Sequence, residues 1–401
     1  MATLANPFLS GINIPDEFFC DRKEETEKLI NWIQNGFNIV LKSPRRIGKS
    51  SLIKHLFQQE IIRSHYNTLF VDIYGTKDMI EFLREFQNAF LDAPFAKTKR
   101  GMRDVTELLR SLYFQMNLTP DGIPAGFRFG IGPGSDTKLP LREMFRFLEN
   151  TAKPTIVVFD EFQAINDYPE KASAILRGYV QQMNNTRFIF SGSSQHLMNR
   201  MFEYPDEPFY RSATSLDLDI ISADAYCSFC QEMFGKYGKT IEEDAVLFVY
   251  YLFSGNTYDM QAVMKHTFAR SNGRKTATRD TVIQTIQEML DGREQEFREI
   301  LNKLGNVKER RTLFCIAAEG IASGLTSTGI MKRYDLDNAS SVQNALKVLS
   351  GDKLNLVRKI GKATYILRDR FFELWLARNN QDLKRKFDEA ESRFKTERSY
   401  R

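Results

Sequence analysis

Gly48, Lys49 and Ser50 stand in succession between an apolar run and a helical pattern, and together they offer groups that bind phosphate. Backbone N–H groups of such a loop and the helix N-terminus attract an anion, and Lys49 adds a full positive charge. Ser50 offers a hydroxyl to a Mg²⁺ ion that bridges phosphates. The spacing predicts a nucleotide-binding loop, and the alternative is an ordinary strand-to-helix turn. The predicted phosphate-binding residues are Ser43, Pro44, Arg45, Arg46, Ile47, Gly48, Lys49, Ser50 and Ser51.

The loop differs at one position from the pattern G-x-x-x-x-G-K-[ST], because Ser43 stands where the first glycine is usual. This serine would strain the loop if its position required a positive φ. Arg45 and Arg46 lie inside the loop. Since Lys49 and the backbone already serve the phosphates, we expect both arginines to face solvent, a lid or a neighbouring chain.

Asp160 and Glu161 directly follow the apolar run 155–159, a pattern typical of a central parallel strand. With Ser50, Asp160 would hold Mg²⁺, through a water molecule. Glu161 would position and deprotonate the water that attacks the γ-phosphate of ATP. The alternative is that the two carboxylates are simply a polar end to the strand.

Later residues complete the predicted catalytic set of Lys49, Glu161, Ser191 and Arg211. Ser191 or Ser193 follows the apolar run 187–190 and would hydrogen-bond the γ-phosphate or its water. Arg211 is a candidate sensor of the γ-phosphate charge, within its own chain or from a neighbouring subunit. A plain strand end and a surface arginine are the alternatives.

The elements that must position these residues alternate between strands and helices. Apolar runs at 39–41, 68–73, 155–159, 187–190 and 214–220 predict strands, and helical periodicity occurs at 79–90, 141–148 and 172–183. Because ligands of open α/β sheets bind at the carboxyl ends of the strands, the candidates should meet at one edge. We also expect a helix from Asp21, capped by Asp21 with Glu24 in capping-box spacing, which either covers the adenine or merely packs. Residues 119–140 predict a loop or small hairpin, whose glycine-rich 130–134 is not expected to bind phosphate.

The 401 residues are 42% hydrophobic and 27% charged, as in soluble globular proteins. No apolar run reaches about 18 residues and the first residues lack a secretory pattern, so we expect a cytoplasmic chain without a membrane partner. Four cysteines favour reduced thiols. Cys227 and Cys230 lie within a helical pattern, which favours burial over a metal or redox role.

The segment from 301 to 370 carries thirteen Lys and Arg against six Asp and Glu, a net charge of +7 in a chain of net +5. Its pattern of three helices and a basic hairpin indicates a winged helix-turn-helix. The third helix, with Asn338, Ser340, Ser341, Gln343, Asn344 and Lys347, would enter the major groove of duplex DNA, and Arg358, Lys359 and Lys362 would contact phosphate. The alternative is a protein-docking module. Residues 382–401 predict a solvated charged helix or disorder.

The chain resembles the prokaryotic AAA-type ATPases of the archaeal ATPase family, relatives of the signal-transduction P-loop NTPases. The resemblance rests on Asp21, Arg22 and Glu25, on the run 43–52, on 157–163 and on 190–193. It extends over roughly residues 6–376 through Gly255 and the winged helix. The resemblance implies an α/β fold with a parallel sheet in the order 5-1-4-3-2, a helical lid, and Mg-ATP as ligand. Thr257 stands where the family commonly has proline.

We therefore expect a P-loop ATPase domain at 1–220, a helical lid at 221–300, a winged helix at 301–380 and a charged tail at 381–401. The predicted function is Mg²⁺-dependent ATP hydrolysis coupled to the placement of a winged helix that contacts DNA or protein. The alternative is a nucleotide-binding regulator or scaffold with negligible hydrolysis. The sequence leaves the partner and the oligomeric state open.

Overall fold

The computed structural model describes residues 6–11, 13–116, 137–271, 276–351, 353–379, 385–390 and 392–393. The chain divides into two compact units, one of Ser10–Ile221 and one of Met1–Leu9 with Ser222–Arg401. Within the described ranges, no helix is both long and apolar enough to cross a membrane.

The first unit is built on a five-stranded sheet in the order β2-β3-β4-β1-β5, with all neighbours parallel. This is the expected order 5-1-4-3-2 counted from the other edge, so the predicted fold class is confirmed. The central strands read as apolar runs because both of their faces are covered. The strands are β1 (Ile39–Lys42), β2 (Asn67–Asp72), β3 (Thr155–Asp160), β4 (Thr186–Gly192) and β5 (Thr214–Asp217).

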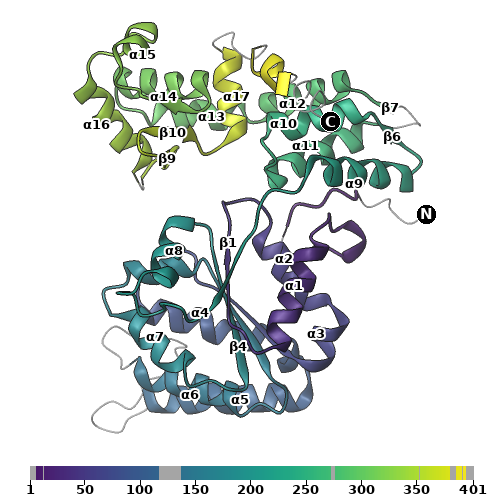
Figure 1. Ribbon diagram of the computed structural model, residues 1–401, viewed down its shortest axis with the longest axis vertical. Coiled ribbons are helices and arrows are strands. Elements are labelled where there is room, and N and C mark those ends of the chain that lie inside the picture. The colour runs from purple at the N-terminus through teal and green to yellow at the C-terminus, as the bar shows by residue number, and fades with distance from the viewer. Residues whose placement is uncertain are drawn as a thin grey trace. The chain divides into compact units, whose positions relative to one another are not determined.

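Helices cover both faces of this sheet (Figure 1). One apolar core includes α4, α6, α7 and α8 with a set of stacked phenylalanines, and the other includes α1, α2 and α3. The helices are α1 (Lys23–Gln34), α2 (Lys49–Gln58), α3 (Glu60–His65), α4 (Met79–Asp92), α5 (Lys99–Met116), α6 (Lys138–Glu149), α7 (Ala172–Val180) and α8 (Gln195–Glu203). Most of the predicted loop 119–140, including 130–134, lies outside the described residues. Its last three residues are helical, because Pro140 occupies the first turn of α6, where its missing N–H costs nothing.

The second unit begins with a helical segment and ends with the winged helix that the sequence predicts. The helical segment comprises α9 (Ala223–Lys236), α10 (Glu243–Leu252), α11 (Thr257–Arg270), α12 (Arg279–Gly292) and α13 (Glu294–Asn302), with the short strands β6 (Thr240–Ile241) and β7 (Thr276–Ala277). The winged helix comprises α14 (Val307–Glu319), α15 (Thr328–Arg333), α16 (Ala339–Ser350) and α17 (Arg370–Asn379). Its sheet has the order β8-β10-β9, from β8 (Ala322–Ser323), β10 (Thr364–Leu367) and β9 (Val357–Gly361).

One local prediction is wrong, and a second is confirmed only in part, since the tail contains the predicted helix. Asp21 does not cap α1, because Asp21 and Arg22 both have left-handed backbone angles, with φ of 57° and 69°, and a side-chain cap needs an extended residue. The charged tail is not simply solvated, because residues 385–390 form a helix in which Lys386, Phe387 and Ala390 are 2%, 8% and 3% exposed. The charged composition of the tail hid this buried face from sequence reasoning.

The four cysteines, Cys20, Cys227, Cys230 and Cys315, are free and buried. Burial raises the pKa of Cys20 to about 12, of Cys227 to about 11 and of Cys315 to about 12. The unfolded chain releases these protons near pH 8.5, whereas the folded chain keeps them. The stability that they contribute is therefore complete below about pH 8.5 and is lost as the pH rises toward these folded values.

We expect the free energy of unfolding in reducing urea solutions to fall between pH 8 and pH 9.5. Each such thiol contributes a slope of at most about 1.4 kcal/mol per pH unit. Cys315→Ala should flatten the slope, because it removes one of the three titrations. An equal slope in Cys315→Ala and wild type would contradict this assignment.

Candidate functional site

The loop between β1 and α2 is attached to the sheet at its first residue. Ser43 is fully buried, and its N–H donates to the carbonyl of Gly192 at the end of β4, 3.4 Å away. Positive φ angles occur at Arg46 (68°) and Gly48 (98°), and not at Ser43. Ser43 therefore replaces the usual glycine without placing a side chain in the left-handed region.

The first residues of α2 bring a charge and a hydroxyl to the carboxyl edge of the sheet. Lys49 is 6% exposed, and burial lowers the pKa of its ammonium while the nearby carboxylates of Glu161 and Asp160 oppose that shift. The hydroxyl of Ser50 donates to Asp160 Oδ2 at 2.6 Å. Residues of α2 and β3 that are far apart in sequence are thus joined directly at this edge of the sheet.

Glu161 is held in place by two polar side chains. Its Oε2 accepts a hydrogen bond from Ser193 Oγ at 2.6 Å and one from Gln163 Nε2 at 2.5 Å. Gln163 itself lies against Gly192, because a Cβ at that glycine would approach Gln163 Oε1 within 2.6 Å. The carboxylate therefore reaches the edge of the sheet in a fixed orientation.

The chemistry of the donors fits a magnesium ion. Ser50 and Asp160 present hard oxygen atoms side by side, and Mg²⁺ binds through one or two such protein ligands, with phosphate and water oxygens completing an octahedron. Within the described ranges, no group of three or more His, Cys, Asp or Glu forms a metal cage of another kind. The site thus suits a metal that arrives with a nucleotide.

The remaining predicted residues lie at different distances from this cluster. Arg45 and Arg46 are exposed, as expected; Arg45 Nε lies 3.4 Å from Ser193 Oγ, and its guanidinium is 5.3 Å from the ring centroid of Tyr74. Ser191 is fully buried within β4, paired in register with Leu41, so Ser193 and not Ser191 contacts Glu161.

Arg211 lies in the turn before β5 with φ of 50°, and its guanidinium is 5.0 Å from the ring of Tyr210. Among the described residues, no hydrogen bond or ion pair joins Arg211 to the cluster around Lys49. The structure therefore brings together every predicted catalytic and metal residue except Ser191 and Arg211.

Sequence reasoning gave no role to three polar residues of the first unit that make several side-chain contacts. Gln163 orients Glu161, as described above. Lys42, 3% exposed at the end of β1, donates to Asn199 and Glu203 of α8. Arg22, 4% exposed, donates to Glu25 and to the carbonyl of Asp219. The signal for Lys42 was a lysine at the end of an apolar run, next to the loop.

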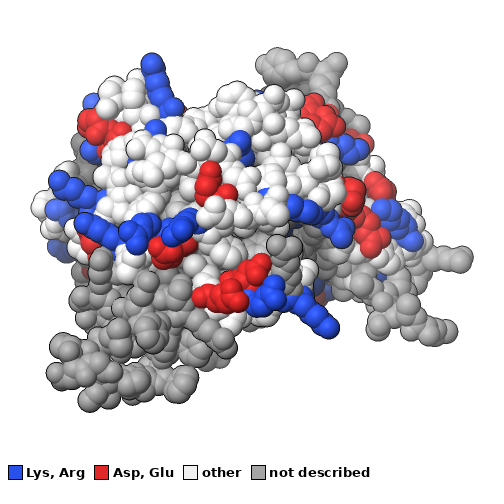
Figure 2. Space-filling model, turned by 90° about the horizontal axis from the view of Figure 1, so that it is seen from below, with Lys and Arg blue, Asp and Glu red and all other residues white. Residues whose placement is uncertain are grey.

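The third helix of the winged helix has one apolar and one polar face. Val342, Ala345, Leu346 and Leu349 of α16 are buried. Asn338, Ser340, Gln343, Asn344 and Lys347 are exposed, as are Lys359 and Lys362 of the wing, while Ser341 and Arg358 are partly exposed. The face shown in Figure 2 carries Lys and Arg together with Asp and Glu, so basic residues do not dominate that face.

Comparisons with known proteins agree with these features. The family described as "ATPase domain predominantly from Archaea" matches residues 19–263, and "Probable winged helix domain" matches 295–378. The Walker-type ATPase PABY2304 of Pyrococcus abyssi is 17% identical, with a TM-score of 0.59 over 92% of this chain and 99% of that one. The ORC1 protein of Aeropyrum pernix, solved in complex with DNA, is 14% identical, with a TM-score of 0.50 over 92% and 96%. The ORC2 protein of the same organism is 14% identical, with a TM-score of 0.50 over 96% and 98%. No curated protein sequence matches the chain.

Proposed function

Because the chain belongs to the family of ATPase domains found predominantly in Archaea, we propose that it binds ATP with Mg²⁺ and hydrolyses it at the edge formed by β1, β3 and β4. Residues 43–51 cradle the phosphates through backbone N–H groups, and Lys49 neutralises their charge. Ser50 and Asp160 hold the metal, the latter through water. When bound there, Mg²⁺ would supply positive charge beside the phosphates.

Glu161 acts as the base for the attacking water. Its carboxylate accepts from Ser193 and Gln163 through Oε2, which leaves Oε1 to take the proton of a water beside the γ-phosphate. Ser193 contacts both Glu161 and Arg45, so it is better placed than Ser191 to respond to the γ-phosphate. Arg211 senses the charge of the γ-phosphate, either within its own chain or from a neighbouring subunit.

The observation that carries this proposal is the joining of Ser50 to Asp160, with Lys49 and Glu161 beside them, at one edge of the sheet. Phosphate release from ATP by the wild-type chain tests it, and the release should require Mg²⁺. In this proposal the chain is divided into an ATPase domain (1–220), a helical lid (221–300) and a winged helix (301–380), followed by a tail (381–401).

We further propose that the winged helix contacts duplex DNA, and that the nucleotide state changes how it is presented. The polar, exposed face of α16 and the exposed lysines of the wing support major-groove and phosphate contacts, respectively. The DNA complex of the ORC1 protein of Aeropyrum pernix, which has a similar fold, is consistent with this use. The alternative hypothesis is that the same surface binds a protein partner.

A salt titration of duplex DNA binding distinguishes a DNA partner from a protein partner. Counterion release should give a log–log slope of about −0.9 for each phosphate contacted, so affinity should fall steeply as salt rises. The double variant Lys359→Gln, Lys362→Gln should lose about two phosphate contacts, and its slope should be shallower accordingly. Arg142→Gln, an exposed arginine of α6, is the matched control and should change nothing. Absent or salt-independent binding would favour a protein partner.

A further inference from the structure

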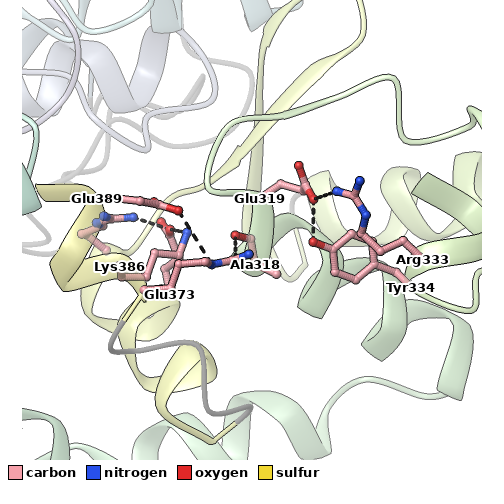
Figure 3. Close-up of polar contacts among 9 residues, drawn as sticks. Ala318, Glu319, Arg333, Tyr334, Glu373, Lys386 and Glu389 are labelled. Carbon is pink, nitrogen blue, oxygen red and sulfur yellow. Dashed lines mark hydrogen bonds and ion pairs between the residues drawn. The ribbon is translucent and has the colours of Figure 1, made fainter. Parts of the chain in front are cut away.

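The described C-terminal helix, residues 385–390, lies beyond the segment that matches the winged-helix family and buries a charge. Lys386 is 2% exposed, and its Nζ donates to Glu373 Oε1 of α17, itself 4% exposed, at 3.0 Å (Figure 3). A charge buried without a partner costs several kcal/mol, so Lys386 requires the carboxylate of Glu373. This pairing fixes the position of the C-terminal helix.

The same carboxylate connects to the helical segment. Arg370, at the start of α17, forms an ion pair with Glu373 Oε1, and its Nε donates to the carbonyl of Leu252 at 2.8 Å. Leu252 ends α10 immediately before the turn at Ser254 and Gly255, whose φ angles are 51° and 70°. Arg370, Glu373 and Lys386 therefore form a triad between that turn and the C-terminal helix. Phe387 strengthens the attachment by packing edge-on against Phe248 of α10, with ring centroids 5.3 Å apart.

The C-terminal helix also holds the winged helix. Arg385 donates to the carbonyl of Ala318 at 2.7 Å, in the last turn of α14, where carbonyls lack partners within the helix. Gly320, which follows α14, leaves room for the pair of Lys386 and Glu373, because a Cβ there would lie 3.0 Å from Lys386 Nζ and 3.5 Å from Glu373 Oε1. Its φ of 70° also favours glycine. The neighbouring Glu319 accepts from Tyr334 at the end of α15, as Figure 3 shows. The last turn of α14 is thus joined to α15 on one side and to the C-terminal helix on the other.

We propose that residues 385–390 are an intramolecular latch that fixes the winged helix to the helical segment beside the turn at 252–255. The latch adds to the ion pairs of Arg293 with Asp369 and of Arg378 with Asp291, which also join the start and end of α17 to the helical segment, so that α9–α13 and α14–α17 move as one body. A nucleotide-driven movement of the lid then carries the winged helix with it. This movement, unlike the latch itself, rests on the proposed function.

Spin labels on the full-length protein test the latch. The native thiols are buried, so labels can be attached selectively to Gln287→Cys on α12 and Ser340→Cys on α16, both exposed positions. The test variants are Lys386→Met, which keeps a long side chain and removes the charge, and a chain that stops before Arg385. Lys332→Met is the matched control, because it makes the same substitution at an exposed lysine of α15, outside the latch.

Without nucleotide, wild type and Lys332→Met should give one narrow label-to-label distance distribution, and both latch variants a broad one. Amide hydrogen exchange in the last turn of α14 and in α17 should be at least about tenfold faster in the latch variants. Narrow distributions and wild-type exchange in both latch variants would overturn the latch, whatever the ATPase activity. A change in the wild-type distance on adding Mg-ATP would overturn the one-body movement.

Discussion

Glu161→Gln should abolish phosphate release while the protein still binds ATP. Glutamine keeps the shape of the side chain and can still accept a hydrogen bond from Ser193, but it cannot take a proton from water. Loss of a general base costs about 10²–10⁴-fold in rate. We expect turnover of Mg-ATP to fall by at least about 10²-fold, with the dissociation constant for ATP changed little, as measured by phosphate release and by calorimetric titration.

Asp167→Asn provides the matched control for this prediction. Asp167 is an exposed carboxylate that closes the short helix Phe162–Asp167 after Glu161, so its loss should leave turnover unchanged. Equal phosphate release by wild type and Glu161→Gln would remove Glu161 from the chemistry. It would favour a base contributed by another residue.

Lys49→Met should remove most of the affinity for ATP. The ammonium of Lys49 is buried and its pKa is lowered by that burial, while the carboxylates of Glu161 and Asp160 oppose the shift. A phosphate would give this charge a partner, and hydrogen bonds to charged groups contribute about 1.5–3 kcal/mol. Loss of the charge should therefore weaken ATP binding by about tenfold or more.

The stability of the Lys49→Met variant distinguishes loss of binding from loss of fold. Removal of a desolvated charge should leave the free energy of unfolding of the nucleotide-free protein unchanged or higher. Lys28→Met on α1 is the control, since Lys28 is exposed and lies over Trp32, with Nζ 4.9 Å from the ring centroid. ATP affinity that is equal in Lys49→Met and wild type would contradict the assigned phosphate site.

The sequence was sufficient to predict the sheet and the central cluster. Gly48, Lys49 and Ser50 open a helix after one apolar run, Asp160 and Glu161 follow another, and parallel strands deliver their carboxyl ends to one edge. The residue types at the end of each apolar run, together with the parallel arrangement of the strands, were therefore enough to predict where these side chains lie. The conformation of Ser43 was left open by the sequence, and the structure places the left-handed angles at Arg46 and Gly48 instead.

The contacts between side chains could not be read from the order of the residues. Gln163 reaches Glu161 because Gly192 of another strand leaves space, and only the assembled sheet shows that approach. Residues 385–390 look like a solvated tail in the sequence because four of the six are charged. Lys386 is nevertheless buried against a partner that lies 13 residues earlier in the sequence, in α17. The burial of two opposite charges against each other leaves no periodic pattern in the sequence.

Single-turnover release of phosphate from ATP by the wild-type protein tests the central claim most directly. The proposed site predicts that bound ATP is converted to ADP and phosphate when Mg²⁺ is present, and that a chelator stops the reaction. ATP that binds to the protein with Mg²⁺ but is recovered intact over the same period would contradict the claim. The chain would then be a nucleotide-binding regulator that does not hydrolyse its ligand.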